Sequence, residues 1–349
     1  MNMHARSKEK VLVAMSGGVD SSVAAAVLIE RGFDVVGMSM EMSGCSARDR
    51  MDAKEVCGRL SIPHFAVDVR EDFRREVMAP FVAEYAAGRT PSPCALCNAL
   101  IKFPALMREA DRLGAPLVAT GHYARVAERG GRFRLLRARD PKKDQSYFLF
   151  RAGQPALSRL LLPLGDMRKD GVRLMARELG FKIAGKRESQ EVCFAPDGDY
   201  AAFVESWEGA PLAGPGEFVD ASGRTLGVHR GIHRYTVGQR RGIGFGGGAR
   251  RYVTAIDAAA NRVVLGPDGA LMRREIALSG VTWAAGAPAS ACTATVKIRS
   301  THRGAAARIE PLPGGDLRVI FESPVRAAAA GQAAVIYDGD EVAGGGWIE

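Results

Sequence analysis

Two cysteines, Cys94 and Cys97, stand three residues apart in the stretch "PSPCALCNALIKF". The chain has six cysteines scattered over 349 residues, which is not the disulfide framework of a small secreted domain. In a reducing compartment a C-x-x-C pair is more often metal-binding or catalytic. Ser92 suits an N-cap and Pro93 a first helical position, so we expect both thiols in or next to the first turn of a helix. The helix dipole there favours thiolate, the form that sulfur chemistry requires.

A second group of candidate residues lies in "AMSGGVDSS", residues 14 to 22. Its two glycines allow a tight turn with inward-facing backbone N–H groups. Asp20, Ser21 and Ser22 stand at the start of an expected helix, where anions are favoured. A phosphate or pyrophosphate fits such a loop. The Walker-type G-x-x-x-x-G-K-[ST] sequence, with its phosphate-binding lysine, is not present.

The elements that must position these residues alternate between strand and helix up to about residue 190. The expected strands are "KVLVAM", "DVVGMSM", "PHFAVDV" and "PLVATGHYARV", and the expected helices are "SSVAAAVLIERG", "RDRMDAKEVCGRLS" and "EDFRREVMAPFVAEYAAG". This order predicts an α/β fold with a parallel, doubly wound sheet that is covered on both faces. The segment "QSYFLFR" alternates like a buried strand, so we expect it in the core.

Beyond about residue 210 the sequence changes to short alternating runs separated by Gly, Pro, Asn and Asp. Examples are "RYVTAIDAAANRVVLG", "ACTATVKIRS" and "AARIEPLPGGDLRVIFES". This pattern predicts small antiparallel β-barrels.

The net charge of +9 is unevenly distributed. Residues 129 to 187 contain 16 Lys and Arg against 5 Asp and Glu, and residues 224 to 251 contain seven Arg and no acid. Two interpretations are open, a solvated Arg-rich surface and a surface that follows the phosphates of a polyanion. The N-terminus has no apolar signal core and no apolar stretch approaches about twenty residues, so we expect a cytoplasmic protein that has no contact with a membrane.

Residues 16 to 21 resemble the pyrophosphatase loop (PP-loop) of the ATP-pyrophosphatase superfamily, whose members split ATP into AMP and pyrophosphate. Within that superfamily the whole chain resembles the tRNA-specific 2-thiouridylases, which replace the C2 oxygen of the wobble uridine (U34) by sulfur. The resemblance extends over "SGGVDSS", "GRTPSPCALCNALIKF", "ATGHYAR", "KKDQSYFL", "ESQEVCF", "TVGQRRGIG" and "GQAAVIYDGDEVAGGGWI". It implies an adenine nucleotide alpha-hydrolase-like catalytic domain over residues 1–200, a small central β-rich domain over 201–272 and a C-terminal tRNA-contacting β-barrel over 273–349.

The resemblance also implies the binding residues. ATP, with Mg²⁺, is expected at Ala14, Met15, Ser16, Gly17, Gly18, Val19, Asp20, Ser21, Met40 and Gly121. Contacts to tRNA are expected at His122, Lys143, Asp144, Gln145, Arg299 and Gln332. The implied substrates are the tRNAs for Glu, Gln and Lys, and the implied sulfur source is a sulfur-donor protein or a cysteine desulfurase relay.

The third chemical candidate is Cys193, in "ESQEVCF". An isolated Cys between Val and Phe is usually a small buried hydrophobe. The resemblance instead makes Cys193 the persulfide bearer and Cys97 the nucleophile that resolves it, leaving a Cys97–Cys193 disulfide to be reduced. Cys94 stands where one form of the family has an aspartate. Cys94, Cys97 and Cys193 are also a ligand set for a [4Fe-4S] cluster with one open iron site, so persulfide and cluster routes both stay open, beside a structural zinc.

Three functions are therefore compared. A tRNA-uridine 2-sulfurtransferase accounts for the loop, the cysteines and the basic segments. A small-molecule ATP-pyrophosphatase synthetase leaves the cysteines and the basic run unexplained, and the sequence shows no glutaminase segment. A non-enzymatic RNA-binding iron-sulfur protein leaves "SGGVDSS" unexplained.

Overall fold

The computed structural model describes residues 8–43, 47–186, 192–195, 198–244, 250–284, 286–288 and 290–349. The chain divides into two compact units. The first comprises Met1–Glu76, Leu96–Phe194 and Asp340–Val342, and the second comprises Val77–Ala95, Ala195–Gly339 and Ala343–Glu349.

The first unit is built on a parallel sheet. Its strands run in the order β3 (His64–Asp68), β2 (Asp34–Glu41), β1 (Lys10–Ala14), β4 (Leu117–Ala119) and β7 (Leu160–Leu161). The strand order reverses between β1 and β4. Ligands of such sheets lie at this switch point, beyond the carboxyl ends of the strands. The predicted parallel sheet is confirmed.

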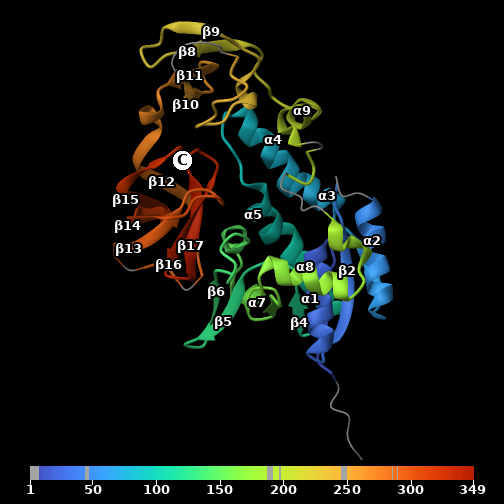
Figure 1. The fold of residues 1–349 in the computed structure, drawn as a ribbon. Coiled ribbons are helices and arrows are strands. Elements are labelled where there is room, and N and C mark those ends of the chain that lie inside the picture. Colours follow the sequence, from blue (N-terminus) through green and yellow to red (C-terminus); the bar gives the residue numbers. More distant parts are fainter. Residues whose placement is uncertain are drawn as a thin grey trace, which may run out of the picture. The chain divides into compact units, whose positions relative to one another are not determined.

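Apolar side chains on both faces of β1 anchor the helices. Val11 and Val13 belong to a core cluster shared with residues of α1 (Val19–Glu30), α2 (Ala47–Arg59) and α8 (Lys169–Glu178). Leu12 is also fully buried and points to the opposite face, because successive side chains of a strand alternate. Helix α6 (Phe103–Arg112) packs against β1 and β4. Figure 1 shows α1 and α2 in blue next to β2. The sheet is covered on both faces, as predicted.

A continuous helical run carries the paired cysteines. It consists of α5 (Pro93–Cys97), η2 (Asn98–Lys102) and α6 (Phe103–Arg112). The middle segment η2 is a π-helical turn, a feature that is frequent at functional sites. An earlier run has the same construction, with α3 (Arg70–Phe73), η1 (Arg74–Met78) and α4 (Ala79–Ala86).

The segment after β4 departs from the expected single strand. Strand β4 ends at Ala119, and a loop leads to the hairpin of β5 (Arg125–Arg129) and β6 (Arg132–Leu136).

The strand prediction for "QSYFLFR" is wrong, since Ser146–Leu149 form the 3-10 helix η3. The Asp144 carboxylate accepts a hydrogen bond from the N–H of Ser146 (3.1 Å), which favours a helical turn at this point. The expected burial is confirmed for Tyr147, Leu149 and Phe150. The remaining elements of this unit are α7 (Gln154–Leu157) and η4 (Lys182–Gly185).

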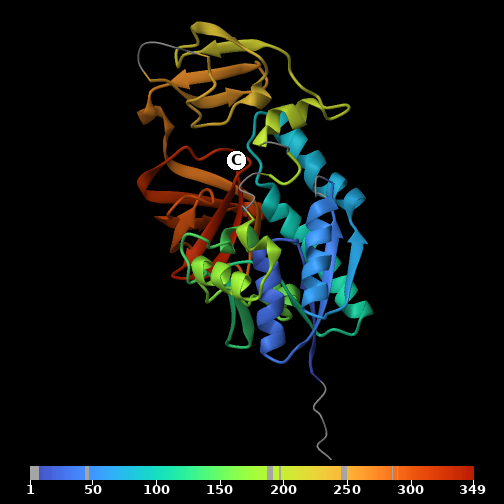
Figure 2. The ribbon, with the colours of Figure 1, turned by 45° about the vertical axis from the view of Figure 1, so that its right-hand side comes forward.

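The second unit contains a small β-sheet, yellow to light orange in Figure 2. Its order is β10 (Tyr252–Asp257), β11 (Arg262–Gly266), β8 (Gly216–Val219) and β9 (Thr225–His229). Strands β11 and β8 run parallel, unlike the antiparallel pairs expected from the sequence, because the chain passes through β9 and β10 before it returns beside β8. Phe218, Val253 and Val263 are part of its core. Short helices of this unit are α9 (Tyr200–Glu205), η6 (Ile232–Arg234), η7 (Asp268–Leu271) and η8 (Pro313–Gly315).

The C-terminal strands form a closed antiparallel barrel, orange to red in Figure 1. Their order is β12 (Met272–Trp283), β15 (Leu317–Arg326), β14 (Ala305–Pro311), β13 (Cys292–Lys297), β16 (Ala333–Asp338) and β17 (Glu341–Ile348), and β17 pairs again with β12. Gly344 lies at this closure, where a Cβ would be 2.3 Å from the carbonyl oxygen of Thr282. The predicted C-terminal barrel is confirmed.

Candidate active site

A pocket of about 370 Å³ opens at the carboxyl ends of β1, β2 and β4 in the first unit. This volume falls in the range of small-molecule sites. Most of the expected ATP residues line it, namely Ala14, Met15, Ser16, Asp20, Ser21, Met40 and Gly121. Gly17, Gly18 and Val19 complete the loop that connects β1 to α1.

The loop conformation depends on Gly17. Its φ of +72° lies in the left-handed region, and a Cβ would be 2.0 Å from the carbonyl oxygen of Asp49. The Ser16 N–H donates to the Ser21 hydroxyl (3.1 Å), and the Ser22 hydroxyl donates to the Gly18 carbonyl (2.8 Å). These bonds close the loop on itself.

The first helix begins slightly earlier than the sequence indicated. Its N-cap is Gly18, which makes no side-chain capping bond, and its first residue is Val19. The positive end of the α1 dipole therefore lies directly at the loop, where it favours an anion.

The loop after β4 approaches the phosphate loop from the other side. A Cβ on Gly121 would lie 2.6 Å from the backbone nitrogen of Ser21 and 2.7 Å from the carbonyl carbon of Asp20. Only glycine allows two backbones to come this close. The two predicted nucleotide segments are thus brought together.

Two lysines that the sequence interpretation did not single out contact the phosphate loop. Lys169 donates from Nζ to both carboxylate oxygens of Asp20, at 2.7 Å each. Lys186 donates to the carbonyl of Gly17 (3.1 Å) and to the carboxylates of Asp49 and Asp52 (2.6 Å each). Both lysines lie in the basic segment of residues 129 to 187, which was the one signal that could have indicated them.

Other cations of that segment are paired within the first unit. Arg134 contacts Glu341 (2.9 Å), Arg139 contacts Asp166 (3.0 Å) and Arg159 contacts Asp111 (2.7 Å). Part of the positive excess is therefore compensated by acids from distant positions. The excess of Lys and Arg over Asp and Glu in this segment therefore overestimates the positive surface that a polyanion could contact.

Two of the expected tRNA residues line the same pocket as the loop. The imidazole Nδ1 of His122 is 2.8 Å from the hydroxyl of Thr120, and burial, aided by Lys102, lowers the His122 pKa to about 3. His122 is therefore neutral at physiological pH. The side-chain oxygen of Gln145 accepts a hydrogen bond from the backbone N–H of Tyr123, and the backbone N–H of Gln145 donates to the Tyr123 carbonyl, both at 2.8 Å.

The two residues before Gln145 form hydrogen bonds within the protein. The Asp144 carboxylate is buried and accepts hydrogen bonds from the backbone of Ala138 and Ser146, both at 3.1 Å. The backbone N–H of Lys143 donates to the carbonyl of Asp140 (3.1 Å). These contacts make Asp144 a residue that shapes the turn.

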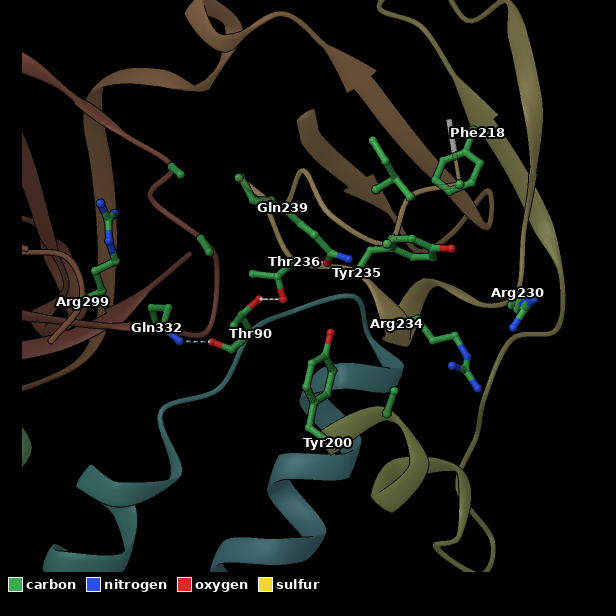
Figure 3. A pocket seen from close by; sticks show the side chains of 18 of the residues that line it. Thr90, Tyr200, Phe218, Arg230, Arg234, Tyr235, Thr236, Gln239, Arg299 and Gln332 are labelled. Atoms are coloured by element: carbon green, nitrogen blue, oxygen red, sulfur yellow. Dashed lines mark hydrogen bonds between the residues drawn. The ribbon is translucent and has the colours of Figure 1, made fainter. Parts of the chain in front are cut away.

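Arg299 and Gln332 line a different pocket, of about 1020 Å³, inside the second unit (Figure 3). The Gln332 amide donates to the carbonyls of Thr90 (3.1 Å) and Pro91 (3.2 Å). Arg299 donates to the carbonyl of Arg326 (2.9 Å). Further side chains that line this pocket are Tyr200, Tyr235, Arg230, Arg234 and Gln239. The expected tRNA residues are therefore divided between the two units.

The three candidate cysteines have different surroundings. Cys97 is 5% exposed, whereas Cys94 and Cys193 are exposed. Exposure of Cys193 contradicts the alternative that it is a small buried hydrophobe. Next to it, the Phe194 ring packs edge-on against Phe73, with 5.6 Å between the ring centres.

Neither a metal-site grouping nor a membrane segment is found in the part of the chain that the structure describes. No three His, Cys, Asp or Glu side chains gather there as metal ligands. Nor does any helix among the described residues have the length and apolar character needed to cross a membrane.

Comparison with known proteins identifies the family. Residues 9–197 match the "tRNA methyl transferase HUP domain", residues 208–267 the "tRNA methyl transferase PRC-barrel domain" and residues 273–348 the "Aminomethyltransferase beta-barrel domain". The tRNA-specific 2-thiouridylase MnmA of Acidithiobacillus ferrooxidans is 47% identical over 346 residues, which cover 98% of each chain. MnmA of Geotalea uraniireducens is 45% identical over 358 residues, which cover 98% of this chain and 95% of the relative. The chain belongs to the tRNA-specific 2-thiouridylase family.

Proposed function

We propose that this enzyme adenylates the C2 oxygen of the wobble uridine U34 of tRNA with ATP and then replaces that oxygen by sulfur. Its relatives are named tRNA-specific 2-thiouridylases. One observation in the structure carries the proposal. Lys102 lines the pocket of the phosphate loop and follows Cys97 by five residues in one continuous helical run. A nucleotide pocket and a candidate nucleophile are thus supported by the same element.

In the first step, O2 of the uracil attacks the α-phosphorus of ATP and pyrophosphate leaves. The α1 N-terminus and the turn at Gly17 present backbone donors suited to the departing pyrophosphate. Mg²⁺ enters with the triphosphate, since it is usually held by one or two carboxylates together with substrate phosphates. Besides Asp20, whose two carboxylate oxygens accept from Lys169, the carboxylates of Glu41 and Asp49 line the pocket and are the ones suited to the ion. The neutral His122 contributes hydrogen bonds without adding a charge.

In the second step, the Cys97 thiolate attacks the inner sulfur of a persulfide on Cys193. The Cys97–Cys193 bond forms, the sulfur–sulfur bond of the persulfide breaks, and the terminal sulfur leaves as sulfide. Sulfide attacks C2 and displaces AMP, which carries the former O2. An external thiol reductant returns the disulfide to two thiols. The persulfide is supplied by a donor protein or a cysteine desulfurase relay.

The [4Fe-4S] alternative needs Cys94, Cys97 and Cys193 around one cluster. Cys97 and Cys193 belong to the first unit and Cys94 to the second. We derive no step through a cluster, and variants of the three cysteines decide between the two routes.

The substrates follow from the same proposal. Contacts to tRNA are assigned to His122, Lys143, Gln145, Arg299 and Gln332, with Asp144 acting through the turn. We expect the tRNAs for Glu, Gln and Lys to be served.

The test is mass spectrometry of tRNA nucleosides after incubation of the enzyme with ATP, Mg²⁺, a persulfide donor and unmodified tRNA. The expected products are 2-thiouridine at U34, AMP and pyrophosphate. Release of ADP and orthophosphate as the stoichiometric products would refute the adenylation step. ATP turnover to AMP with a small-molecule acceptor and without tRNA would favour a synthetase instead.

A further inference from the structure

Lys169 is the first residue of α8, and its position is unusual for a lysine. Its side chain is 7% exposed, and Nζ lies 2.7 Å from each carboxylate oxygen of Asp20. Asp20 receives a third hydrogen bond at Oδ1, from the hydroxyl of Tyr123 (2.8 Å). The loop carboxylate therefore accepts hydrogen bonds from a buried cation and from a buried phenol.

The lysine itself is also held in place. Its backbone N–H donates to the Asp140 carboxylate (3.1 Å), and its Nζ lies 5.6 Å from the centre of the Tyr123 ring. Helix α8 packs against α1, and Val172 and Ala176 join the core cluster beneath the loop. The Lys169 ammonium is therefore held beside Asp20 by a helix that packs into the core.

A buried ion pair is poor evidence for stability, because removing two charges from water costs about as much as their attraction returns. The location of the pair suggests another use. Asp20 is 31% exposed and lines the nucleotide pocket, whereas Lys169 is not among the described residues that line it. The aspartate therefore faces the pocket, and the buried lysine contacts it from within the protein.

We propose that Lys169 is a positioning residue for the ATP step, which acts through Asp20 by compensating its charge and fixing its orientation. An uncompensated carboxylate in the phosphate loop would repel the triphosphate. The loop has no lysine of its own, and a lysine 149 positions away supplies the charge. This inference rests on the proposed use of ATP by the enzyme.

The test is equilibrium binding of ATP, measured by calorimetry on the full chain. For Lys169→Met we expect affinity to fall about tenfold or more, because the Asp20 charge is no longer compensated. The double variant Asp20→Asn with Lys169→Met removes both charges and should recover most of the lost affinity. A structural role alone would lower the thermal midpoint without such a recovery.

The matched control is Lys182→Met, which removes an equal charge from an exposed pair with Glu55 (2.7 Å). It should leave ATP affinity unchanged. If Lys169→Met binds ATP as the unsubstituted enzyme does, or if the double variant stays as weak as Lys169→Met, the inference is wrong while the proposed function stands. If the unsubstituted enzyme itself does not bind ATP, the proposed function and this inference fail together.

Discussion

A methyl group on Gly121 would lie 2.6 Å from the backbone nitrogen of Ser21, so the loop after β4 and the phosphate loop approach each other at backbone distance. Gly121→Ala must therefore displace one of the two loops. Misplacement of a reacting group by about 1 Å can cost roughly 100-fold in rate, and we expect a loss of this order in ATP–pyrophosphate exchange. Exchange of labelled pyrophosphate into ATP measures it.

Gly58→Ala is the matched control for this prediction. Gly58 lies in α2, and a Cβ there would meet no atom within 4 Å. The exchange rate should be unchanged, and stability should rise by up to about 1 kcal/mol, as expected when a helical glycine becomes alanine. Equal rates for both variants would show that the close approach of the two loops is not needed.

The sequence predicted the parts of the fold in which short apolar runs alternate with longer helix-forming segments. The strands β1, β2 and β3 and the helices α1 and α2 could be located from this alternation along the chain. The closed C-terminal barrel was likewise predicted from alternating runs. The short apolar run "QSYFLFR" was misread, because periodicity does not separate a strand from a helical turn over so few residues.

The chemistry around the loop was only partly predictable. The glycines and serines of the phosphate loop are adjacent in sequence and form a recognisable motif. Lys169 and Lys186 contact the loop across sequence separations of 149 and 169 residues. A single charged side chain produces no periodic pattern in the sequence. The sequence therefore indicated a basic segment there, but could not indicate which lysines face the loop.

Asp20→Ala should abolish adenylation and leave tRNA affinity nearly intact. The carboxylate lies in the ATP pocket, and its removal also breaks its ion pair with the buried ammonium of Lys169. Breaking a buried pair in this way costs about 3 kcal/mol in the free energy of unfolding. Pyrophosphate exchange and a tRNA gel-shift, both carried out well below the thermal midpoint, separate the two effects. A loss of tRNA affinity as large as the loss of rate would contradict the assignment.

The stability of the protein should depend on pH through His122. Burial lowers the pKa of its imidazole to about 3, while the unfolded chain titrates near 6.5. Below pH 6.5 the unfolded state binds more protons, so this contribution to stability is complete above pH 6.5 and is lost as the pH falls towards 3. In His122→Asn the decline in unfolding free energy between pH 6 and 5 should be smaller by about 1 kcal/mol per pH unit. Urea unfolding of both proteins at pH 7.5, 6 and 5 tests this. If the free energy of unfolding falls with pH equally in the unsubstituted enzyme and in His122→Asn, the imidazole is not desolvated.

The three cysteine variants should behave differently in sulfur transfer. Cys193 is exposed and is the proposed persulfide bearer, so Cys193→Ser should accept no labelled sulfur at that site. Cys97 is buried and is the proposed resolving nucleophile, so Cys97→Ser should accept sulfur but fail to thiolate tRNA. Cys94→Ser should be mildly impaired. Single-turnover assays with a ³⁵S-labelled persulfide donor, followed by analysis of the tRNA and of the protein-bound label, measure both steps.

Cys94→Ser discriminates most sharply between persulfide and cluster chemistry. In the persulfide route Cys94 forms no bond to the transferred sulfur, so its loss leaves most of the activity. In a cluster held by three thiolates, each substitution would remove one of three protein ligands and cost the same chromophore and the same activity. Anaerobic purification with iron and sulfide analysis completes the comparison. An iron-free enzyme that thiolates tRNA at full rate, with Cys94→Ser almost as active, is the expected result, whereas strict iron dependence together with inactivation by Cys94→Ser would rule out the persulfide route.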